Sequence, residues 1–326
     1  MTFTSPYSVV DLDTLGAGGR SAAREVLERC QSVDGRPPLG DHALSALAQV
    51  PPSVGCFAVL APSGLVAYAQ TTPTIEALPT WTIDVAIDPL HRHDAAAILD
   101  AALGAAVAWV RPRDAASVQW WCRQPTDIDH DVAERHGLLP RRQLLEMHVD
   151  VRHEPERSSL RTRSFVEGLD EQSLLEVNNL AFATHPDQGN WTLTALQGRF
   201  ASEWFEPAGL LLHFDAHGTM LGFCWTKIHG ADGGRNSGQP DIGEIYVLAV
   251  HPDHGGRGLG RALAVAGLQS LASRNVRRVM LFVDGGNTAA LSVYRQIGFE
   301  VTSTTIAFQA NRRPDGGRGE CAGLPE

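Results

Sequence analysis

The chain has 326 residues, 43% of them hydrophobic and 20% charged, which is ordinary for a globular protein and favours two domains over one. Its formal net charge of −10 argues against a nucleic-acid-binding or anionic-membrane surface, so any phosphate would be held mainly by backbone N–H groups. The five cysteines include no C-x-x-C pair, which argues against a zinc ribbon or a disulfide scaffold and favours a reducing cytosol.

Two stretches of the chain predict the same order of elements. In each, a helical pattern is followed by three β-type runs, an alanine- and leucine-rich helix, a strand, a short helix that ends at glycine, and a final β-type run. In the first stretch, the elements before the final run are expected at 19–32, 54–60, 64–70, 81–88, 94–109, 117–122 and 128–136. In the second stretch, the same elements are expected at 170–183, 208–214, 220–229, 243–250, 258–274, 279–283 and 288–297. The order predicts an α+β (mixed α/β) fold of two tandem domains.

The domain boundaries follow from composition. Residues 153–159 are polar and contain a proline, which is typical of a linker. Residues 311–326 are rich in glycine, arginine and proline and have no apolar period, which predicts a disordered tail. We therefore expect an N-terminal domain at 1–152 and a C-terminal domain at 160–310.

A glycine loop, Gly255-Gly256-Arg257-Gly258-Leu259-Gly260, separates a buried strand from the start of a helix. Glycine lets the backbone approach a phosphate closely, and the first N–H groups of a helix favour an anion. Arg257 and Arg261 would add charge-assisted contacts. The loop is neither a Walker loop nor G-x-G-x-x-G, and the alternative is a plain glycine turn. We interpret it as a pyrophosphate cradle.

Two side chains near this loop can move protons. Glu244 begins the strand that precedes the loop, where a carboxylate can act as a general base. Tyr294 lies in Asn287-x-x-Ala290-x-x-x-Tyr294-x-x-x-Gly298-Phe299 on the last helix, where a phenol can protonate a leaving thiolate. The alternatives are a solvated or lysine-paired carboxylate and a tyrosine that packs in the core.

The first half carries the scaffold without these groups. Residues 85–89 match residues 248–252 at an offset of 163, and Gly137 matches Gly298. This alignment sets Trp81 opposite Glu244, residues 92–97 opposite 255–260, and Ala133 opposite Tyr294. We therefore expect the second half to be catalytic and the first half to be degenerate, since core packing and site chemistry are separable.

The glycine loop and the last-helix motif resemble those of the GNAT-type N-acetyltransferases, whose loop reads Q/R-x-x-G-x-G/A. The chain departs at the first position, where Gly255 stands. The resemblance implies domains with a central mixed sheet flanked by helices, and acetyl-CoA as co-substrate. It implies Glu244 as base, Tyr294 as acid, and N–H groups at 248–250 that polarise the thioester carbonyl if the strand bulges there. The implied acetyl-CoA residues are Leu248, Ala249, Val250, Gly255, Gly256, Arg257, Gly258, Leu259, Gly260, Arg261, Asn287 and Tyr294.

Further motifs resemble the mycothiol synthase family of tandem GNAT proteins. They run from Val177-Asn178-Asn179 to Trp191, through Phe223-x-Trp225-Thr226-Lys227, and into the strand that begins at Glu244. This resemblance implies acetyl transfer to the cysteinyl amine of Cys-GlcN-Ins, an aminosugar-inositol. The implied substrate residues are Asp41, Asp187, Lys227 and Glu244, and the alternative for the first three is a solvated surface charge.

Two other functions stay open at this point. The chain can be a GNAT enzyme for a different small amine, or a non-catalytic acyl-CoA-binding protein. The spacings His91-x-His93 and His251-x-x-His254 are weak metal signals, and we expect no metal. We expect a cytoplasmic monomer with no nucleic-acid partner, no signal peptide and no apolar run approaching the roughly 18 residues of a membrane span.

Overall fold

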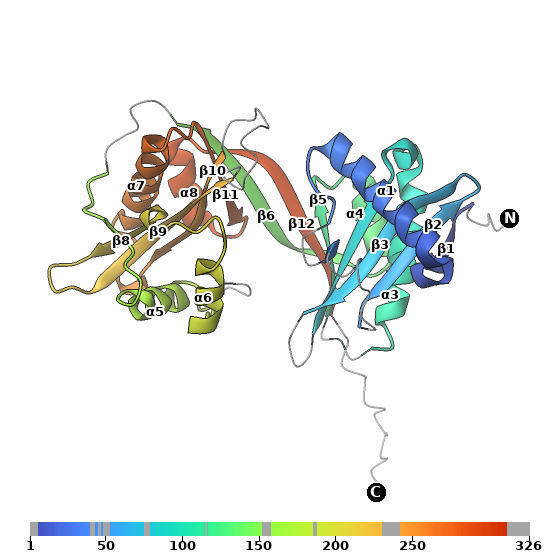
Figure 1. Ribbon diagram of the computed structural model, residues 1–326, viewed down its shortest axis with the longest axis horizontal. Helices are drawn as coiled ribbons and strands as arrows, with labels where there is room; N and C mark the ends of the chain where they lie inside the picture. Colours follow the sequence, from blue (N-terminus) through green and yellow to red (C-terminus); the bar gives the residue numbers. More distant parts are fainter. Residues whose placement is uncertain are drawn as a thin grey trace, which may run out of the picture. The chain divides into compact units, whose positions relative to one another are not determined.

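The computed structural model describes residues 6–39, 43–44, 47, 53–74, 79–113, 115, 117–151, 158–184, 188–229 and 242–311 (Figure 1). Contacts divide the chain into two units, Met1–Gln143 with Thr305–Glu326, and Leu144–Thr304. Most of the expected linker and nearly all of the expected tail lie outside the described residues.

Unit 1 is a mixed sheet with helices on both faces. Its strands follow the order β1-β2-β3-β4-β5-β12, and β4 and β5 are parallel. Helix α1 covers one face, while α3 and α4 pack with the core cluster on the other (Figure 1). The elements are β1 Ser8–Asp11, α1 Gly16–Asp34, β2 Gly55–Ala61, β3 Gly64–Pro73, β4 Thr80–Ile87, η2 Pro89–Asp94, α3 Ala95–Val110, β5 Ser117–Arg123 and α4 Asp127–Arg135, with a short helix η1 Leu12–Leu15.

Unit 2 repeats this arrangement. Its strands follow the order β6-β11-β10-β9-β8-β7, and β10 and β11 are parallel. Helices α5 and α6 lie on one face, and α7 and α8 on the other (Figure 1). The elements are β7 Arg163–Ser164, α5 Glu171–Ala181, α6 Leu193–Phe200, η3 Pro207–Gly209, β8 Leu210–Phe214, β9 Met220–His229, β10 Ile242–Val250, η4 Pro252–His254, α7 Leu259–Ser273, β11 Arg278–Asp284 and α8 Thr288–Ile297. The expected α+β fold with helix-flanked mixed sheets is confirmed.

The last β-type run of each half is a long strand that has residues in both units. Strand β6 (Leu139–Asp150) begins in unit 1, and its residues 144–150 pair with β11 of unit 2. Strand β12 (Glu300–Asn311) begins in unit 2, and its residues 305–311 pair with β5 of unit 1. The division by contacts falls inside these two strands, between Gln143 and Leu144 in β6 and between Thr304 and Thr305 in β12.

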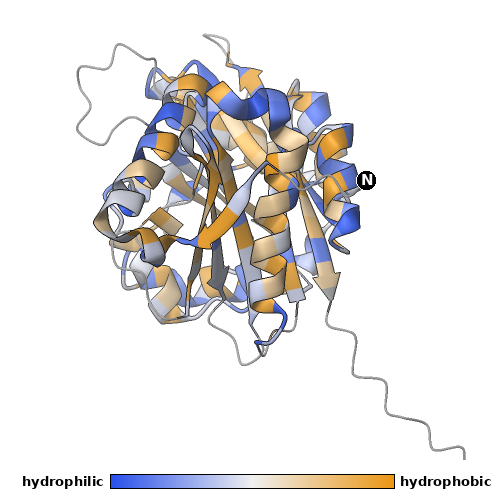
Figure 2. Cartoon of the chain, turned by 90° about the vertical axis from the view of Figure 1, so that its right-hand side faces the viewer, coloured by the Kyte–Doolittle hydropathy of each residue, from blue (hydrophilic) through white to orange (hydrophobic). Residues whose placement is uncertain are grey.

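Helix α3 is unusually apolar. Together with η2 it forms the stretch Pro89–Val110, the one stretch of the described chain that is apolar and long enough to cross a membrane by length and composition alone. Its inward residues recur at helical spacing and join the core of unit 1, and they are Ile98, Leu99, Ala102, Leu103, Ala106 and Val110. The packing of α3 in the core of unit 1 accounts for its apolar composition. Figure 2 shows apolar colour along the strands and mixed apolar and polar colour on the helices.

Candidate functional site

The sheet of unit 2 opens between β10 and β11. Their parallel pairing runs from Ile242–Arg278 to Ile245–Leu281 and ends there, while β10 continues to pair with β9 as far as Val250. The register against β9 shifts between Ile245 and Val247, so Tyr246 is an extra residue in a β-bulge. A bulge twists its strand, and here it stands where β10 leaves β11.

The opening leaves backbone donors without a strand partner. The N–H of His251 donates to the carbonyl of Leu221 on β9 at 2.9 Å. Alternation along an antiparallel pair then points the N–H groups of Ala249 and Val247 at β9, and those of Leu248 and Val250 away from it. Leu248 and Val250 therefore present their N–H groups on the side where pairing with β11 has ended.

The glycine loop leads directly into α7. Gly256 has φ 71° and Gly258, the N-cap of α7, has φ 79°, and a Cβ added at either would meet no atom within 4 Å. The first helical bond runs from Ala262 N to Gly258 O at 3.1 Å, so the N–H groups of Leu259 and Gly260 precede the intrahelical ladder. Open space, left-handed glycines and free helix N–H groups together fit a pyrophosphate.

Glu244 lies on the sheet face that carries α5 and α6. Its side chain is 10% exposed, and its Oε2 is 2.7 Å from Nε2 of His229. Lys227 is directly opposite Glu244 in the register of β9 and β10, but its Nζ lies 4.8 Å from the ring centroid of Trp204. The mainly buried carboxylate therefore has an imidazole as partner, and its neighbour Lys227 faces an aromatic ring.

Tyr294 lies on the opposite face of the same sheet. It is 8% exposed, belongs to the cluster with α7, and its ring contacts Phe299 with centroids 5.7 Å apart. Burial, helped by the charge of the Cys224 thiolate form, raises the pKa of Tyr294 above its ordinary value. None of the described residues hydrogen bonds to its hydroxyl. A tyrosine that keeps its proton can act only as an acid, although the same packing also suits a core residue.

Asn287 is the N-cap of α8. Its Oδ1 accepts a hydrogen bond from the N–H of Ala290 at 3.0 Å. The side-chain carbonyl is therefore used to start the helix that carries Tyr294, and the amide nitrogen is the part that remains for a ligand.

Comparisons with known proteins agree with this site. The model of the acetyltransferase (GNAT) family matches residues 173–299, which include the bulge, the glycine loop and α8. The chain is 36% identical to a mycothiol acetyltransferase of Kocuria rhizophila over 293 residues, covering 87% of this chain and 93% of the relative. It is also 36% identical to one of Rhodococcus jostii over 304 residues, covering 89% and 95%. The chain belongs to the mycothiol acetyltransferase family. It is an acetyltransferase of the GNAT class, whose members use acyl-CoA.

Solved structures support the fold. A GCN5-related N-acetyltransferase from Sphaerobacter thermophilus matches with a TM-score of 0.68 and 23% identity, covering 96% of this chain and 98% of that one. A tandem GNAT protein from the clavulanic acid biosynthesis pathway matches with a TM-score of 0.59 and 15% identity, covering 94% and 98%. The likeness over nearly whole chains confirms two GNAT-type domains in tandem.

The alignment of the two halves needs one correction, at Glu244. Parallel pairing ends at Ile83 in β4 and at Ile245 in β10, so Thr82, and not Trp81, is the counterpart of Glu244. The reason is the extra residue Tyr246 in the bulge of β10, since β4 pairs with β3 without a shift. The offset between matching residues of the two halves is therefore 162 before the bulge and 163 after it. Trp81 instead packs in the core with α3. The hydroxyl of Thr82 accepts from Gln119 Nε2 at 3.1 Å, so unit 1 still has no carboxylate at this position.

The start of α3 differs from the start of α7. Residues 92–97 contain no glycine. Arg92 donates two hydrogen bonds to Asp34, at 2.8 and 2.7 Å, and Asp94, the N-cap of α3, accepts one from Tyr7. A cavity of about 560 Å³ lies where β4 and β5 separate, lined among others by Arg92 and Asp34. The guanidinium is already paired and a carboxylate stands at the helix N-terminus, which disfavours a phosphate there.

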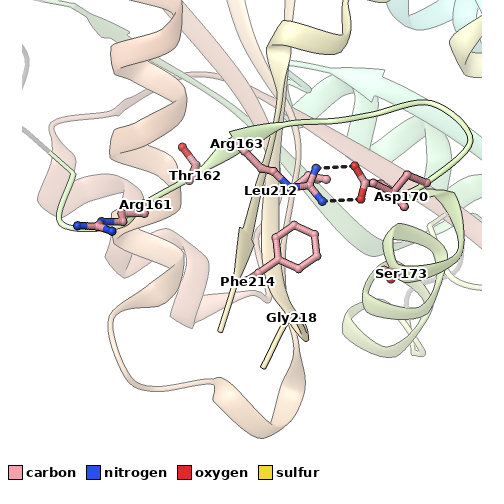
Figure 3. A pocket seen from close by; sticks show the side chains of 9 residues that line it. Arg161, Thr162, Arg163, Asp170, Ser173, Leu212, Phe214 and Gly218 are labelled. Carbon is pink, nitrogen blue, oxygen red and sulfur yellow. Dashed lines mark hydrogen bonds and ion pairs between the residues drawn. The ribbon is translucent and has the colours of Figure 1, made fainter. Parts of the chain in front are cut away.

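A cavity of unit 2 has a lining that does not include Glu244. It has a volume of about 530 Å³ and is lined by residues before β7, at the start of α5 and on β8 (Figure 3). Arg163 donates to both carboxylate oxygens of Asp170 at 2.6 Å and lies 4.4 Å from the ring centroid of Phe214. Since these charges satisfy each other and the glycine loop does not line the cavity, we assign it no part in acetyl transfer.

Two sets of predicted residues remain, and one residue of the site was not predicted. Asp41 and Asp187 lie outside the described residues, so their predicted contacts stay predictions. Arg257 is exposed, and Gly255 has φ −62°, a conformation open to any residue. His229 was missed, because nothing in the sequence distinguishes it from the other histidines until the register of β9 and β10 brings it to Glu244.

Proposed function

We propose that the chain is a mycothiol synthase, which transfers the acetyl group of acetyl-CoA to the cysteinyl amine of Cys-GlcN-Ins. The observation that carries this proposal is the near full-length identity of 36% to proteins named mycothiol acetyltransferase. The arrangement of unit 2 supports it, because β10 carries a carboxylate and backbone donors, the glycine loop follows β10, and α8 carries a phenol.

Unit 2 is the catalytic domain in this proposal, and unit 1 is a degenerate copy. Bound acetyl-CoA supplies an activated acetyl group. Its pyrophosphate lies against the N–H groups at 256–261, since the N–H of Gly255 donates to the carbonyl of Pro252. Arg257, Arg261 and the amide of Asn287 add polar contacts. The N–H groups of Leu248 and Val250 donate to the thioester carbonyl, with Ala249 between them on the same strand.

Proton movement falls to two side chains. The acceptor arrives as an ammonium ion and must lose a proton before its nitrogen can attack the carbonyl carbon. Glu244 takes that proton, directly or through a water, with the oxygen that His229 does not hold. Tyr294 gives its proton to the sulfur as the C–S bond breaks, the nitrogen releases its second proton as the amide forms, and Tyr294 regains a proton through solvent. The raised pKa of Tyr294 keeps it protonated until the bond breaks. Lys227, Asp41 and Asp187 bind the aminosugar and inositol groups.

The test is a CoA-release assay with acetyl-CoA and a panel of amines that includes Cys-GlcN-Ins. We expect the highest kcat/KM with Cys-GlcN-Ins. Equal or better use of simple amines would defeat the substrate assignment and leave an acetyltransferase for another amine. Glu244→Gln should lower kcat about 10²–10⁴-fold and remove one ionisation from the pH–rate profile, whereas an unchanged profile would rule out Glu244 as the base.

A further inference from the structure

Glu244 has a histidine partner for which acetyl transfer as described above assigns no role of its own. His229 Nε2 lies 2.7 Å from Glu244 Oε2, a distance typical of a charge-assisted hydrogen bond. We propose that His229 is a positioning residue for the general base: it holds one carboxylate oxygen so that the other faces the acceptor amine. This inference rests on the proposed function and adds a residue to it.

The backbone fixes this pair. His229 is the last residue of β9 and lies opposite Ile242, while Lys227 lies opposite Glu244. Alternate residues of a strand share a face, so the imidazole and the carboxylate are diagonal neighbours across two paired strands. Side chains carried by paired strands keep their geometry better than side chains on loops. The pair is therefore suited to hold a base in one orientation.

The nearby ammonium group does not perform the same task. Lys227 is closer to Glu244 in register, yet its Nζ lies over the Trp204 ring at 4.8 Å. A lysine paired with a carboxylate favours its ionised form and would oppose the protonation that a general base undergoes in each turnover. A neutral imidazole orients the carboxylate through one N–H without adding a charge. The turning of Lys227 toward Trp204 leaves this role to His229.

The two side chains differ in exposure. Glu244 is 10% exposed and His229 is 35% exposed, so the imidazole stands toward solvent. An ionised carboxylate only accepts, so Nε2 of His229 carries the proton that it donates to Oε2 of Glu244.

The experiment compares His229→Leu with His229→Gln in the full chain, with acetyl-CoA and the best amine of the panel. Leucine removes the donor, so kcat should fall about 10–100-fold while the KM for acetyl-CoA stays unchanged, as for other residues that orient an active group. Glutamine keeps an N–H donor, so it should restore most of kcat.

A matched control is His148→Gln. His148 also pairs with a carboxylate on this face, Glu146 at 2.8 Å, but belongs to β6. This variant should leave kcat and the KM for acetyl-CoA unchanged. The inference is overturned if His229→Leu keeps the wild-type kcat or changes only a KM. It is also overturned if His229→Gln is as slow as His229→Leu. The proposed function is judged separately, by which amine the wild-type enzyme uses, because the comparison of variants holds with any amine that turns over.

Discussion

Lys227 and Glu244 lie directly opposite each other on β9 and β10, yet their charges do not pair within the described residues. The ammonium lies over Trp204 and the carboxylate bonds to His229. This separation leaves Lys227 available to the acceptor and Glu244 available as a base, on one face of one sheet.

The first prediction concerns Lys227. Lys227→Met keeps the aliphatic stem that packs near Trp204 and removes the charge. If the ammonium binds hydroxyl groups of the aminosugar-inositol, the KM for Cys-GlcN-Ins should rise about tenfold, in the range of one lost charge-assisted hydrogen bond. Steady-state kinetics with both substrates measures this. The KM for acetyl-CoA should stay the same, and a change in that KM alone would show that Lys227 belongs to the cofactor side.

The second prediction concerns the first position of the glycine loop. Gly255 has an ordinary φ of −62°, and a Cβ there would meet only the carbonyl oxygen of Pro252, at 3.3 Å. Gly255→Gln, which restores the residue type common in the wider family, should therefore fold normally and lower the Kd for acetyl-CoA about two- to tenfold by one added hydrogen bond.

Gly256→Ala is the contrasting variant in the same loop. Gly256 has φ 71°, so alanine costs about 1–2 kcal/mol of backbone strain or shifts the loop. Calorimetry should show a higher Kd for acetyl-CoA in this variant than in the wild type. If Gly255→Gln weakens binding as much as Gly256→Ala does, the first position is crowded when acetyl-CoA is bound.

The third prediction is the stoichiometry of acetyl-CoA. Unit 1 lacks the loop glycines, Arg92 is paired with Asp34, and Asp94 stands at the N-terminus of α3. Calorimetry should give about one acetyl-CoA per chain, since a carboxylate at that helix end repels a phosphate. A value near two would show that the cavity between β4 and β5 binds a second molecule without a glycine cradle.

How much the sequence predicted can be judged from particular elements. The strand expected at 220–229 and the helix expected at 258–274 correspond to β9 (Met220–His229) and α7 (Leu259–Ser273), because period and glycine signals are local. The counterpart of Glu244 was wrong by one residue, because a bulge leaves no clear mark on hydrophobic periodicity. The partners of β6 and β12 could not be predicted, since alternation identifies a strand and does not name the strand it pairs with.

The fourth prediction concerns the packing of α7 on β9. A Cβ on Gly267 would lie 2.6 Å from Sγ of Cys224, which is fully buried. Gly267→Ala should therefore destabilise unit 2 by about 1–3 kcal/mol, the range of overpacked cores. The matched control is Gly198→Ala in α6, where a Cβ meets nothing within 4 Å and the gain should be roughly 0.5–1 kcal/mol. Thermal unfolding measures both, and equal effects would show that α7 can move away from β9.

The fifth prediction is a pH dependence of stability at Asp84. Burial raises the pKa of Asp84 from 3.8 to about 6, and no described residue pairs with its carboxylate, which lies opposite Gln70 on β3. Below pH 3.8 the carboxyl group of Asp84 is protonated in both the folded and the unfolded chain, so its contribution to stability is fully present there. As the pH rises through about 6 that contribution is lost, because the folded chain must then hold a charge in a partly buried place.

Asp84→Asn removes this loss of stability. The variant should match the wild type near pH ~4 and exceed it by about 1–2 kcal/mol near pH ~7.5, a value reduced for the partial exposure of the site. Denaturant unfolding at both pH values gives the comparison. The control is Glu134→Gln, an exposed carboxylate on α4, which should show no such difference. If Asp84→Asn is less stable than the wild type near pH ~7.5, the ionised carboxylate stabilises the folded chain, and the charge at Asp84 is then held by a favourable interaction and not opposed by burial.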